Sequence, residues 1–571
     1  MNSKEKSKII NILSITLFFL MLLIWTLWQF HFNYMVSMYD TFFHTQRIYE
    51  IRLAFLQHTL PSWVNFNTFF NTGQAINGMY PDFTLWPLVL ITNFLTPIHQ
   101  IIAIRSLVFG LTFIVSFLSL NKRFDTQNAI LAATIFTLSG SAIKDLTNEM
   151  QTGSAIVMIF AFPLLFTFKE AVESKKIDYK LIIKTALLMT IVINSHLLSA
   201  VVIAMVTGIF LIIETILKKN YSAWINLLGA ALLTVILCLP VIYRILKISK
   251  SGLLAPFGKG TVVSDSLFAL FSTTTWNGKS TISIASIILL LIAIIGFNKS
   301  KLRQLIPWLS IELVLILFCT NIVPWNLLEH LPILNTFQVA NWRFAPFLGM
   351  IPLILILVNF NQKYTRIILL SMVVISYLMA IRTAYVAQYK FKVTPQLVTA
   401  TTTEQVPMNA TVKLTSSGIN SNKLARTLIP DYAPNSVPLE KNTNGASLDS
   451  QLIYLISNHL ATTKQRDIAL SHQSNINSVT FKAKNVPKGS ISLPVFGYRT
   501  LIYHIYLNNH RIKGTLNPYG FITVYSKKDL KNATYKVEQV QPKLYRPLIL
   551  ISFILYVSLL GILIAPIFKK K

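Results

Sequence analysis

The chain has 571 residues, of which 53% are hydrophobic and only 13% are charged. Soluble domains carry about 25% charged residues, so this composition excludes an ordinary soluble protein and indicates a polytopic membrane protein. The formal net charge of +30 does not indicate nucleic-acid binding, because many of the lysines and arginines punctuate apolar runs, as they do in cytoplasmic loops.

Twelve apolar runs are candidates for bilayer-spanning helices, which need roughly 17–25 residues. They centre on 9–30, 100–120, 127–143, 154–169, 180–195, 196–217, 223–243, 281–297, 305–322, 345–361, 366–386 and 546–567. With a cytoplasmic N-terminus, the basic clusters between them all face the cytoplasm, provided that the short run 83–97 stays at the outer face. These clusters are Lys122/Arg123, Lys169 to Lys180, Lys218/Lys219, Lys299 to Arg303, Lys363/Arg366 and Lys569 to Lys571. We therefore predict a multi-pass protein of the cell membrane with about twelve spans.

The segment 387–545 differs in kind from the apolar runs. It is polar, and its second half alternates as strands do, in "SVTFKAK", "LIYHIYL", "GFITVY" and "TYKVEQV". We predict an extracytoplasmic β-rich domain here. It follows a transmembrane domain at 1–386, whose first outer loop is 31–99, and precedes a last span with a basic cytoplasmic tail at 546–571.

The first outer loop opens with "MYDTFFHTQRIYEIR". Asp40, His44 and Arg47 are spaced at i, i+4 and i+7, so they share one face if this piece is helical. A carboxylate here can act as a general base or hold a divalent cation, and an arginine can grip a phosphate. Asp82 lies further along the same loop. Interfacial residues that reach to water, with an internal Asp–Arg pair, are the alternative.

Other outer segments supply further candidates. Asp145 and Glu149 lie four residues apart in "KDLTNEMQTG", and His196 lies at the outer end of two apolar runs. Trp342 and Arg343 begin another outer-leaflet helix, where an arginine is costly unless it pairs or faces water. A solvated loop, a polar helix cap and contacts with lipid headgroups remain the respective alternatives.

Several familiar catalytic signals are absent from the sequence. It has no Walker loop, no serine elbow, no H-E-x-x-H and no cysteine metal cluster. No inner loop is long enough for a nucleotide-sugar domain. Any sugar donor must therefore be membrane-borne or extracellular.

One span followed by a long outer loop with "YDTFFHTQRI", "LP" and "YPDF" resembles the GT-C superfamily of polytopic glycosyltransferases. More narrowly, the chain resembles the YfhO-like bacterial membrane proteins, whose membrane part is sometimes labelled a 6-pyruvoyl-tetrahydropterin-synthase-related domain. The resemblance extends over essentially the whole chain. It includes "NSHLLSA", "LPILNTFQVANWRF", "LIPDYAP" and "LPVFGYRTLIYHIYLNN".

The resemblance implies transfer of a sugar from a polyprenyl-phosphate donor to an extracytoplasmic cell-envelope acceptor, such as a teichoic-acid-like polymer or another surface glycan. Together with the chemistry above, it assigns catalysis to Asp40, His44 and Glu149, donor-phosphate binding to Arg47, Arg343 and His196, and substrate binding to Asp82, Asp145, Gln338 and Trp342.

No cofactor is required by these residues, although Mg²⁺ or Mn²⁺ held through Asp40 stays an open alternative. The expected partners are the lipid-linked sugar, the bilayer and an anionic acceptor, because 387–545 holds about 19 Lys and Arg against about 7 Asp and Glu. Two other functions stay open. One is a catalytically inactive scaffold, and the other is a transporter or flippase for lipid-linked glycans, which would place charges near the midplane of its spans.

Overall fold

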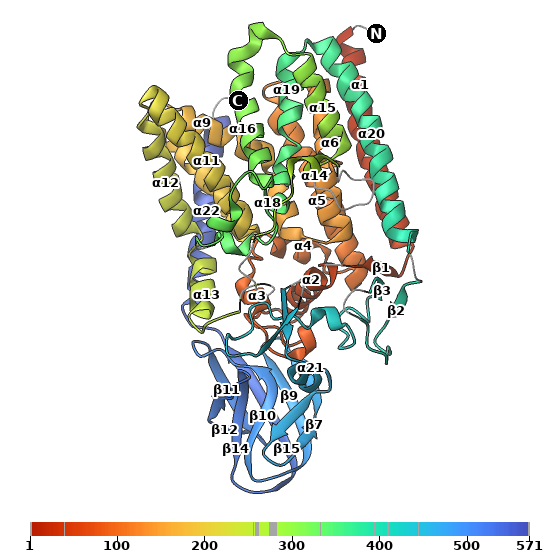
Figure 1. The fold of residues 1–571 in the computed structure, drawn as a ribbon, viewed down its shortest axis with the longest axis vertical. Coiled ribbons are helices and arrows are strands. Elements are labelled where there is room, and N and C mark those ends of the chain that lie inside the picture. The colour runs from red at the N-terminus through yellow and green to blue at the C-terminus, as the bar shows by residue number, and fades with distance from the viewer. Residues whose placement is uncertain are drawn as a thin grey trace.

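The computed structural model describes residues 3–38, 40–254, 256, 262–272, 282–331, 333–391, 394–407, 410–442 and 445–568. A helical bundle forms one end of the molecule and a β-sandwich the other, with the first outer loop between them (Figure 1). Both ends of the chain lie on the side of the bundle that is away from the sandwich (Figure 1). The protein is a mostly helical membrane protein with a β-rich region before its last helix, as the sequence predicts.

Seven helical segments in the described part of the chain are long and apolar enough to cross a bilayer. They are Glu5–Phe30 in α1 (Ser3–Phe30), α5 (Pro97–Asn121), α11 (Leu197–Lys218), Lys299–Cys319 with α16 (Leu302–Cys319), Ala340–Asn359 with α18 (Ala340–Leu348) and α19 (Ile351–Asn359), α20 (Gln362–Tyr389), and Tyr545–Ala565 in α22 (Tyr545–Phe568). Exposed leucine and isoleucine side chains cover α1 and α22, as expected for helices that face lipid.

Three bent helix pairs raise the count to ten if each pair is one span. They are α6 (Thr126–Thr137) with α7 (Gly140–Ile143), α8 (Thr152–Ile159) with α9 (Ala161–Glu173), and α12 (Ser222–Leu237) with α13 (Leu239–Ser249). The remaining two of the twelve predicted runs are also helical. They are α10 (Tyr179–Ser195, 17 residues) and α15 (Ile284–Ile295, 12 residues), and the latter is only roughly 18 Å long.

The first outer loop is an ordered layer. It contains β1 (Tyr34–Ser37), α2 (Thr41–Leu56), a 3-10 turn at Phe69–Asn71, α3 (Ile76–Met79) and α4 (Leu85–Thr92). Strand β1 pairs with β3 (Val412–Thr415), which in turn pairs with β2 (Gln396–Val398). The polar segment after α20 is thus joined to the first loop by a sheet.

The sandwich consists of two five-stranded sheets. One has the order β13-β14-β10-β6-β7 and the other β12-β11-β15-β9-β8. The strands are β6 (Leu460–Thr463), β7 (Asp467–Ala469), β8 (Ser471–Asn475), β9 (Ser478–Val486), β10 (Gly489–Phe496), β11 (Ile502–Leu507), β12 (His510–Ile512), β13 (Gly514–Leu516), β14 (Phe521–Ser526) and β15 (Leu530–Val540). The four alternating sequences quoted above lie on β9, β11, β14 and β15. A β4–β5 hairpin (Leu439–Asn442, Gly445–Leu448) and α21 (Ser450–Ser457) precede them.

The core of the sandwich continues into the first outer loop. Trp63 packs edge-on against Tyr545 with ring centroids 4.8 Å apart, and both belong to the same buried cluster as strand residues Phe481 and Val537. Gly73 has a φ of +68°, and a Cβ there would lie 2.8 Å from the ring of Phe66 in the same loop and 3.3 Å from Val495 of β10 in the sandwich. Only glycine allows this close approach of loop and sandwich.

A buried ion pair joins the first outer loop to the bundle. Asp82 Oδ1 lies 2.7 Å from Arg244 Nη2, and the two side chains are 0% and 1% exposed. Arg244 also donates to the hydroxyl of Tyr545 and to the carbonyl of Tyr80, while the Trp86 indole donates to Asp82 Oδ2. The pair therefore links the loop, α13 and the start of α22.

We predict that Asp82→Asn destabilises the protein by about 3–5 kcal/mol, because it leaves the Arg244 charge buried without a counter-ion. Thermal unfolding of the purified protein in detergent should show a clear drop in melting temperature. Asp467→Asn, at an exposed carboxyl on the sandwich, is the matched control and should melt like the wild type. Equal melting of Asp82→Asn and wild type would contradict this role of the pair.

A second prediction concerns topology. Helix α4 has eight residues, roughly 12 Å, which is less than half of a hydrocarbon core about 30 Å thick, so residues 83–97 should not cross the membrane. Single cysteines at His99 and Asn121, the two ends of α5, should then react with an impermeant maleimide from opposite sides. The native cysteines are buried, so the unsubstituted protein serves as the blank. Reaction of both positions from outside intact cells would overturn the topology.

Candidate functional site

Two carboxylates from segments far apart in the chain meet beside the bundle. Asp40 occupies the N-cap of α2, and Glu149 follows a π-helical turn at Lys144–Asn148 that continues α7. The side-chain amide nitrogen of Gln151 lies 3.3 Å from Asp40 Oδ2 and 2.8 Å from Glu149 Oε2. One amide group therefore donates to both carboxylates and holds them on either side of it.

Basic side chains surround this pair of acids. Lys144 Nζ lies 3.3 Å from Glu149 Oε1 and 4.6 Å from the ring centroid of Trp342. Arg426, from the polar segment after α20, approaches Asp40 Oδ1 at 4.0 Å. The side chains of Asp40 and Arg426 are 33% and 27% exposed, so a ligand can reach them from outside.

The surroundings change the acidity of both carboxyls. Burial raises the pKa of Asp40, although the charges of Arg426, Arg343 and Lys144 act in the opposite direction. Burial raises the pKa of Glu149 to about 7, against the lowering effect of Lys144. A carboxyl with a pKa near 7 can accept or release a proton at physiological pH, which suits general acid–base catalysis.

The predicted residues of α2 gather around Tyr80. The guanidinium carbon of Arg47 lies 3.9 Å from the Tyr80 ring centroid, and the side chain is 1% exposed. Arg47 also donates to the carbonyl of Pro81 and lies 3.3 Å from Nδ1 of His44. All these contacts are internal, so they orient Tyr80. The binding of a donor phosphate by Arg47 stays a prediction.

The two histidines are neutral groups. Nδ1 of His196 accepts the backbone N–H of Ser199, so its proton resides on Nε2. Burial, together with the smaller effects of the Arg343 and Arg47 charges, lowers the pKa of His196 to about 3. Burial likewise lowers the pKa of His44 well below its usual value. At physiological pH these side chains act as hydrogen-bonding and orienting groups rather than as cations.

Arg343 connects the Tyr80 group with the acids. Its Nε donates to the carbonyl of Phe337, and its Nη2 donates to Oε1 of Gln338, each at 2.9 Å. Burial raises the pKa of Tyr80. The charges of Arg47 and Arg343 lower this pKa, and the charge of Asp40 raises it, so all three charges lie within electrostatic reach of the phenol.

The other predicted residues are less central. Asp82 is held in the ion pair with Arg244, and Oδ2 of Asp145 accepts a hydrogen bond from Ser154. Trp342 is 39% exposed and covers Lys144. The structure therefore gathers Asp40, Glu149 and Arg343 into one site with Tyr80 and the side chains around it. It places Asp82 in the neighbouring buried ion pair with Arg244.

Sequence reasoning missed five residues of this site: Tyr80, Lys144, Gln151, Arg426 and Tyr432. Four of them lie within motifs quoted above, Lys144 and Gln151 in "KDLTNEMQTG", Tyr80 in "YPDF" and Tyr432 in "LIPDYAP", so the polar character of these motifs was an available signal. Tyr432, from "LIPDYAP", lies within electrostatic reach of Tyr80, Arg47 and Arg343. Arg426 has no local signal, because only the tertiary fold brings it to Asp40.

The acids do not form a metal site of the usual kind. In the ranges that the structure describes, no three or more His, Cys, Asp or Glu side chains are placed to hold a metal ion. Glu149 and Asp40 already have Lys144, Arg426 and Gln151 as partners. Mg²⁺ or Mn²⁺ held through Asp40 stays a prediction, because one or two carboxylates can hold such an ion together with a substrate phosphate.

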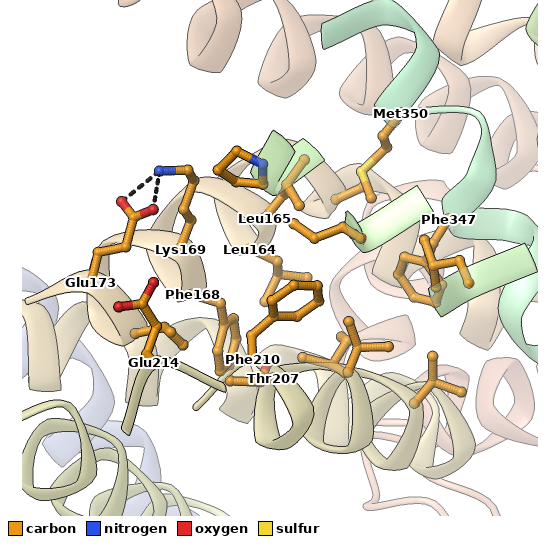
Figure 2. A pocket seen from close by; sticks show the side chains of 18 residues that line it. Leu164, Leu165, Phe168, Lys169, Glu173, Thr207, Phe210, Glu214, Phe347 and Met350 are labelled. Carbon is orange, nitrogen blue, oxygen red and sulfur yellow. Dashed lines mark hydrogen bonds and ion pairs between the residues drawn. The ribbon is translucent and has the colours of Figure 1, made fainter. Parts of the chain in front are cut away.

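Hollows lie in the described part of the bundle, and two of them matter for the site. The larger, about 830 Å³ with part of its space open to the outside, lies between α9, α11, α16 and α18–α19 (Figure 2). Its walls are apolar, and its charged residues Lys169, Glu173 and Glu214 gather at one edge (Figure 2). None of the predicted site residues lines it. A smaller hollow of about 430 Å³ is lined by Lys144, Ser283, Ser376 and Thr383, so it adjoins the acids.

Comparisons with known proteins give little further information. No protein-family model and no curated protein sequence matches the chain. A solved structure that resembles it is the single-particle cryo-EM structure of the arabinofuranosyltransferase AftD from mycobacteria, with 14% sequence identity and a TM-score of 0.41. The match covers 65% of this chain and 27% of that chain, so this chain spans about a quarter of the length of AftD.

We predict that Glu149 is protonated below a pH of about 7 and ionised above it, because burial raises its pKa to that value. Dicyclohexylcarbodiimide modifies protonated carboxyls in apolar surroundings, so labelling of the peptide that contains Glu149 should fall as pH rises through about 7, as measured by mass spectrometry. Lys144→Gln removes the neighbouring cation and should move this fall to higher pH.

Glu149→Gln should lose the label altogether and is the control for the peptide assignment. Labelling that has already disappeared at pH 5, or that Lys144→Gln leaves unchanged, would contradict the proposed electrostatics.

Proposed function

We propose that this protein is a membrane glycosyltransferase that moves a sugar from a polyprenyl-phosphate donor to an acceptor on the extracytoplasmic face. The observation that carries the proposal is the meeting of Asp40 and Glu149 around Gln151, with three basic side chains within electrostatic reach. The resemblance of the sequence to GT-C glycosyltransferases supports the same reaction class.

The proposed transfer needs a base on the acceptor side. The acceptor hydroxyl oxygen attacks the anomeric carbon of the donor sugar, the bond from that carbon to the phosphate oxygen breaks, and the hydroxyl proton passes to Asp40. The exposure of Asp40 lets an acceptor hydroxyl approach it. Glu149, whose pKa is about 7, lies on the other side of the same amide and can exchange that proton with solvent.

The donor side needs positive charge. A lipid phosphate is already a good leaving group, so preorganised cations rather than a general acid stabilise its departure. Arg343 and Lys144 are the proposed phosphate contacts, with His196 as a neutral donor beside them. The smaller hollow at Lys144 lies beside these contacts, between α7, α15 and α20. No metal takes part in this proposal.

The orientation of the protein in the membrane is part of the same proposal. The N-terminus is cytoplasmic, the segment 387–545 is extracytoplasmic, and the acids face the outer side. The acceptor is anionic, a teichoic-acid-like polymer or another surface glycan, because the outer segment is strongly basic.

Radiolabel from a polyprenyl-phosphate-linked sugar tests the proposal. With the gene present, the label should enter a cell-envelope polymer, and without the gene it should remain in the lipid. A flippase would change only the leaflet in which the labelled lipid is found, and an inactive scaffold would change neither quantity. Either of these results would overturn the proposed transfer.

We predict that Asp40→Asn lowers the transfer rate by a factor on the order of 10²–10⁴, the usual contribution of a positioned base. Asparagine keeps the size of the side chain and its contact with Gln151, so the expression level and melting temperature should stay unchanged. Asp467→Asn, which removes an exposed carboxyl of the sandwich, should turn over normally. Wild-type turnover by the purified Asp40→Asn protein would remove Asp40 from the mechanism.

A further inference from the structure

The outward face of one sheet of the sandwich is basic. In β9, Lys482 and Lys484 alternate with buried Phe481 and Ala483, so the two lysines point away from the core. Both are exposed. Lys536 of β15 belongs to the same face, because it pairs with Thr480, two residues before Lys482.

The register continues this face over two more strands. Lys536 pairs with Tyr506 of β11, and Tyr506 pairs with Arg511 of β12. The amine of Lys536 lies 5.7 Å from the Tyr506 ring centroid. We call the surface of Lys482, Lys484, Lys536, Arg511 and Tyr506 the basic face.

The spacing on the basic face is regular. Lys482 and Lys484 are two residues apart on one strand, about 7 Å. Lys536 is a diagonal neighbour of Lys482 on the next strand, where side chains are about 7–8 Å apart. The acid Glu538 lies 3.4 Å from Lys536, but four basic groups share the face with it. Lys482 and Lys536 form a diagonal line across β9 and β15, and Arg511 of β12 lies level with Lys536, with Tyr506 of β11 between them.

The outward face of the other sheet differs from the basic face in its residue types. Its register pairs Ser490 with Tyr525, and Ser492 with both Thr523 and Thr462. Asp467 follows beside Thr462. No Lys or Arg occurs at these paired positions in the part of the sheet that the structure describes. The cations near this second sheet, such as Lys464, Lys488 and Lys527, lie in loops at the ends of its strands, whereas those of the basic face lie on the strands themselves.

We propose that the basic face binds a linear polyanion of glycopolymer type, with the anionic groups of the polymer on the cations of that face and a sugar or polyol unit against Tyr506. The face belongs to the sandwich, at the end of the molecule away from the bundle (Figure 1). Headgroups of the surrounding bilayer lie on the other side of the first outer loop, and charges are screened over about 8 Å at 0.15 M salt. A polymer outside the membrane is therefore the ligand that fits.

This proposal rests on the proposed function only in taking the polymer as the acceptor of the transfer. Binding needs no catalysis, so it can be measured separately. If Asp40→Asn abolishes transfer and still binds the polymer, both ideas stand. Binding without any transfer by the wild type would remove the proposed function and leave the basic face as a polymer-binding surface.

The test uses the full chain in nanodiscs of neutral phosphatidylcholine, with fluorescein-labelled poly(glycerol phosphate) as the probe and neutral dextran as its comparison. Fluorescence anisotropy should show binding of the polyanion that weakens between 20 mM and 300 mM salt, and no binding of dextran. The variant Lys482→Gln, Lys484→Gln, Arg511→Gln, Lys536→Gln should lose at least ten-fold in affinity at low salt.

A matched control removes the same number of charges from the exposed loop positions Lys464, Lys488, Lys527 and Lys528, each replaced by glutamine. Its affinity should stay within about two-fold of wild type. Replacing Lys482, Lys484 and Lys536 by arginine keeps the charges and should keep the affinity, which separates charge from folding. Equal losses in the two glutamine variants, or no polyanion binding at low salt, would overturn the proposal.

Discussion

The buried ion pair between Asp82 and Arg244 is the interaction on which the outer half of the protein depends. Both side chains are almost completely removed from water, so either charge alone would cost several kcal/mol. Arg244 also donates to the Tyr80 carbonyl and to the hydroxyl of Tyr545. The first outer loop, the helix α13 and the last membrane helix are therefore held as one unit.

Arg244 of this pair holds the backbone of Tyr80 in place, and Tyr80 in turn positions the side chains around its ring. Its ring carries the guanidinium of Arg47 on one face, and both His44 and His196 lie within about 6 Å of it. Burial keeps both histidines neutral, so the positive charge near the acids comes from lysine and arginine side chains. Electrostatic interactions between the acids and these cations are stronger here than in water, because the site is partly shielded from solvent.

The segment after α20 takes part in both the site and the outer surface. Arg426 reaches back to Asp40, and strands β2 and β3 extend the sheet that begins with β1 in the first loop. The sandwich shares a hydrophobic core with the same loop. A polymer bound on the sandwich would thus be attached to the layer that carries the acids, because the loop of that layer shares the core of the sandwich.

The sequence by itself determined the helical membrane class, the positions of the apolar helices, four of the sandwich strands and the helix that carries His44 and Arg47. These features are local, because they depend on hydrophobic periods of 3.6 and 2 residues within short windows. The tertiary structure alone decided that Asp82 pairs with Arg244, that Gln151 bridges Asp40 and Glu149, and that Arg426 completes the group. Apart from the local Gln151–Glu149 hydrogen bond, these contacts join residues more than 100 positions apart, and a buried charge takes whichever partner the packing of distant segments brings to it.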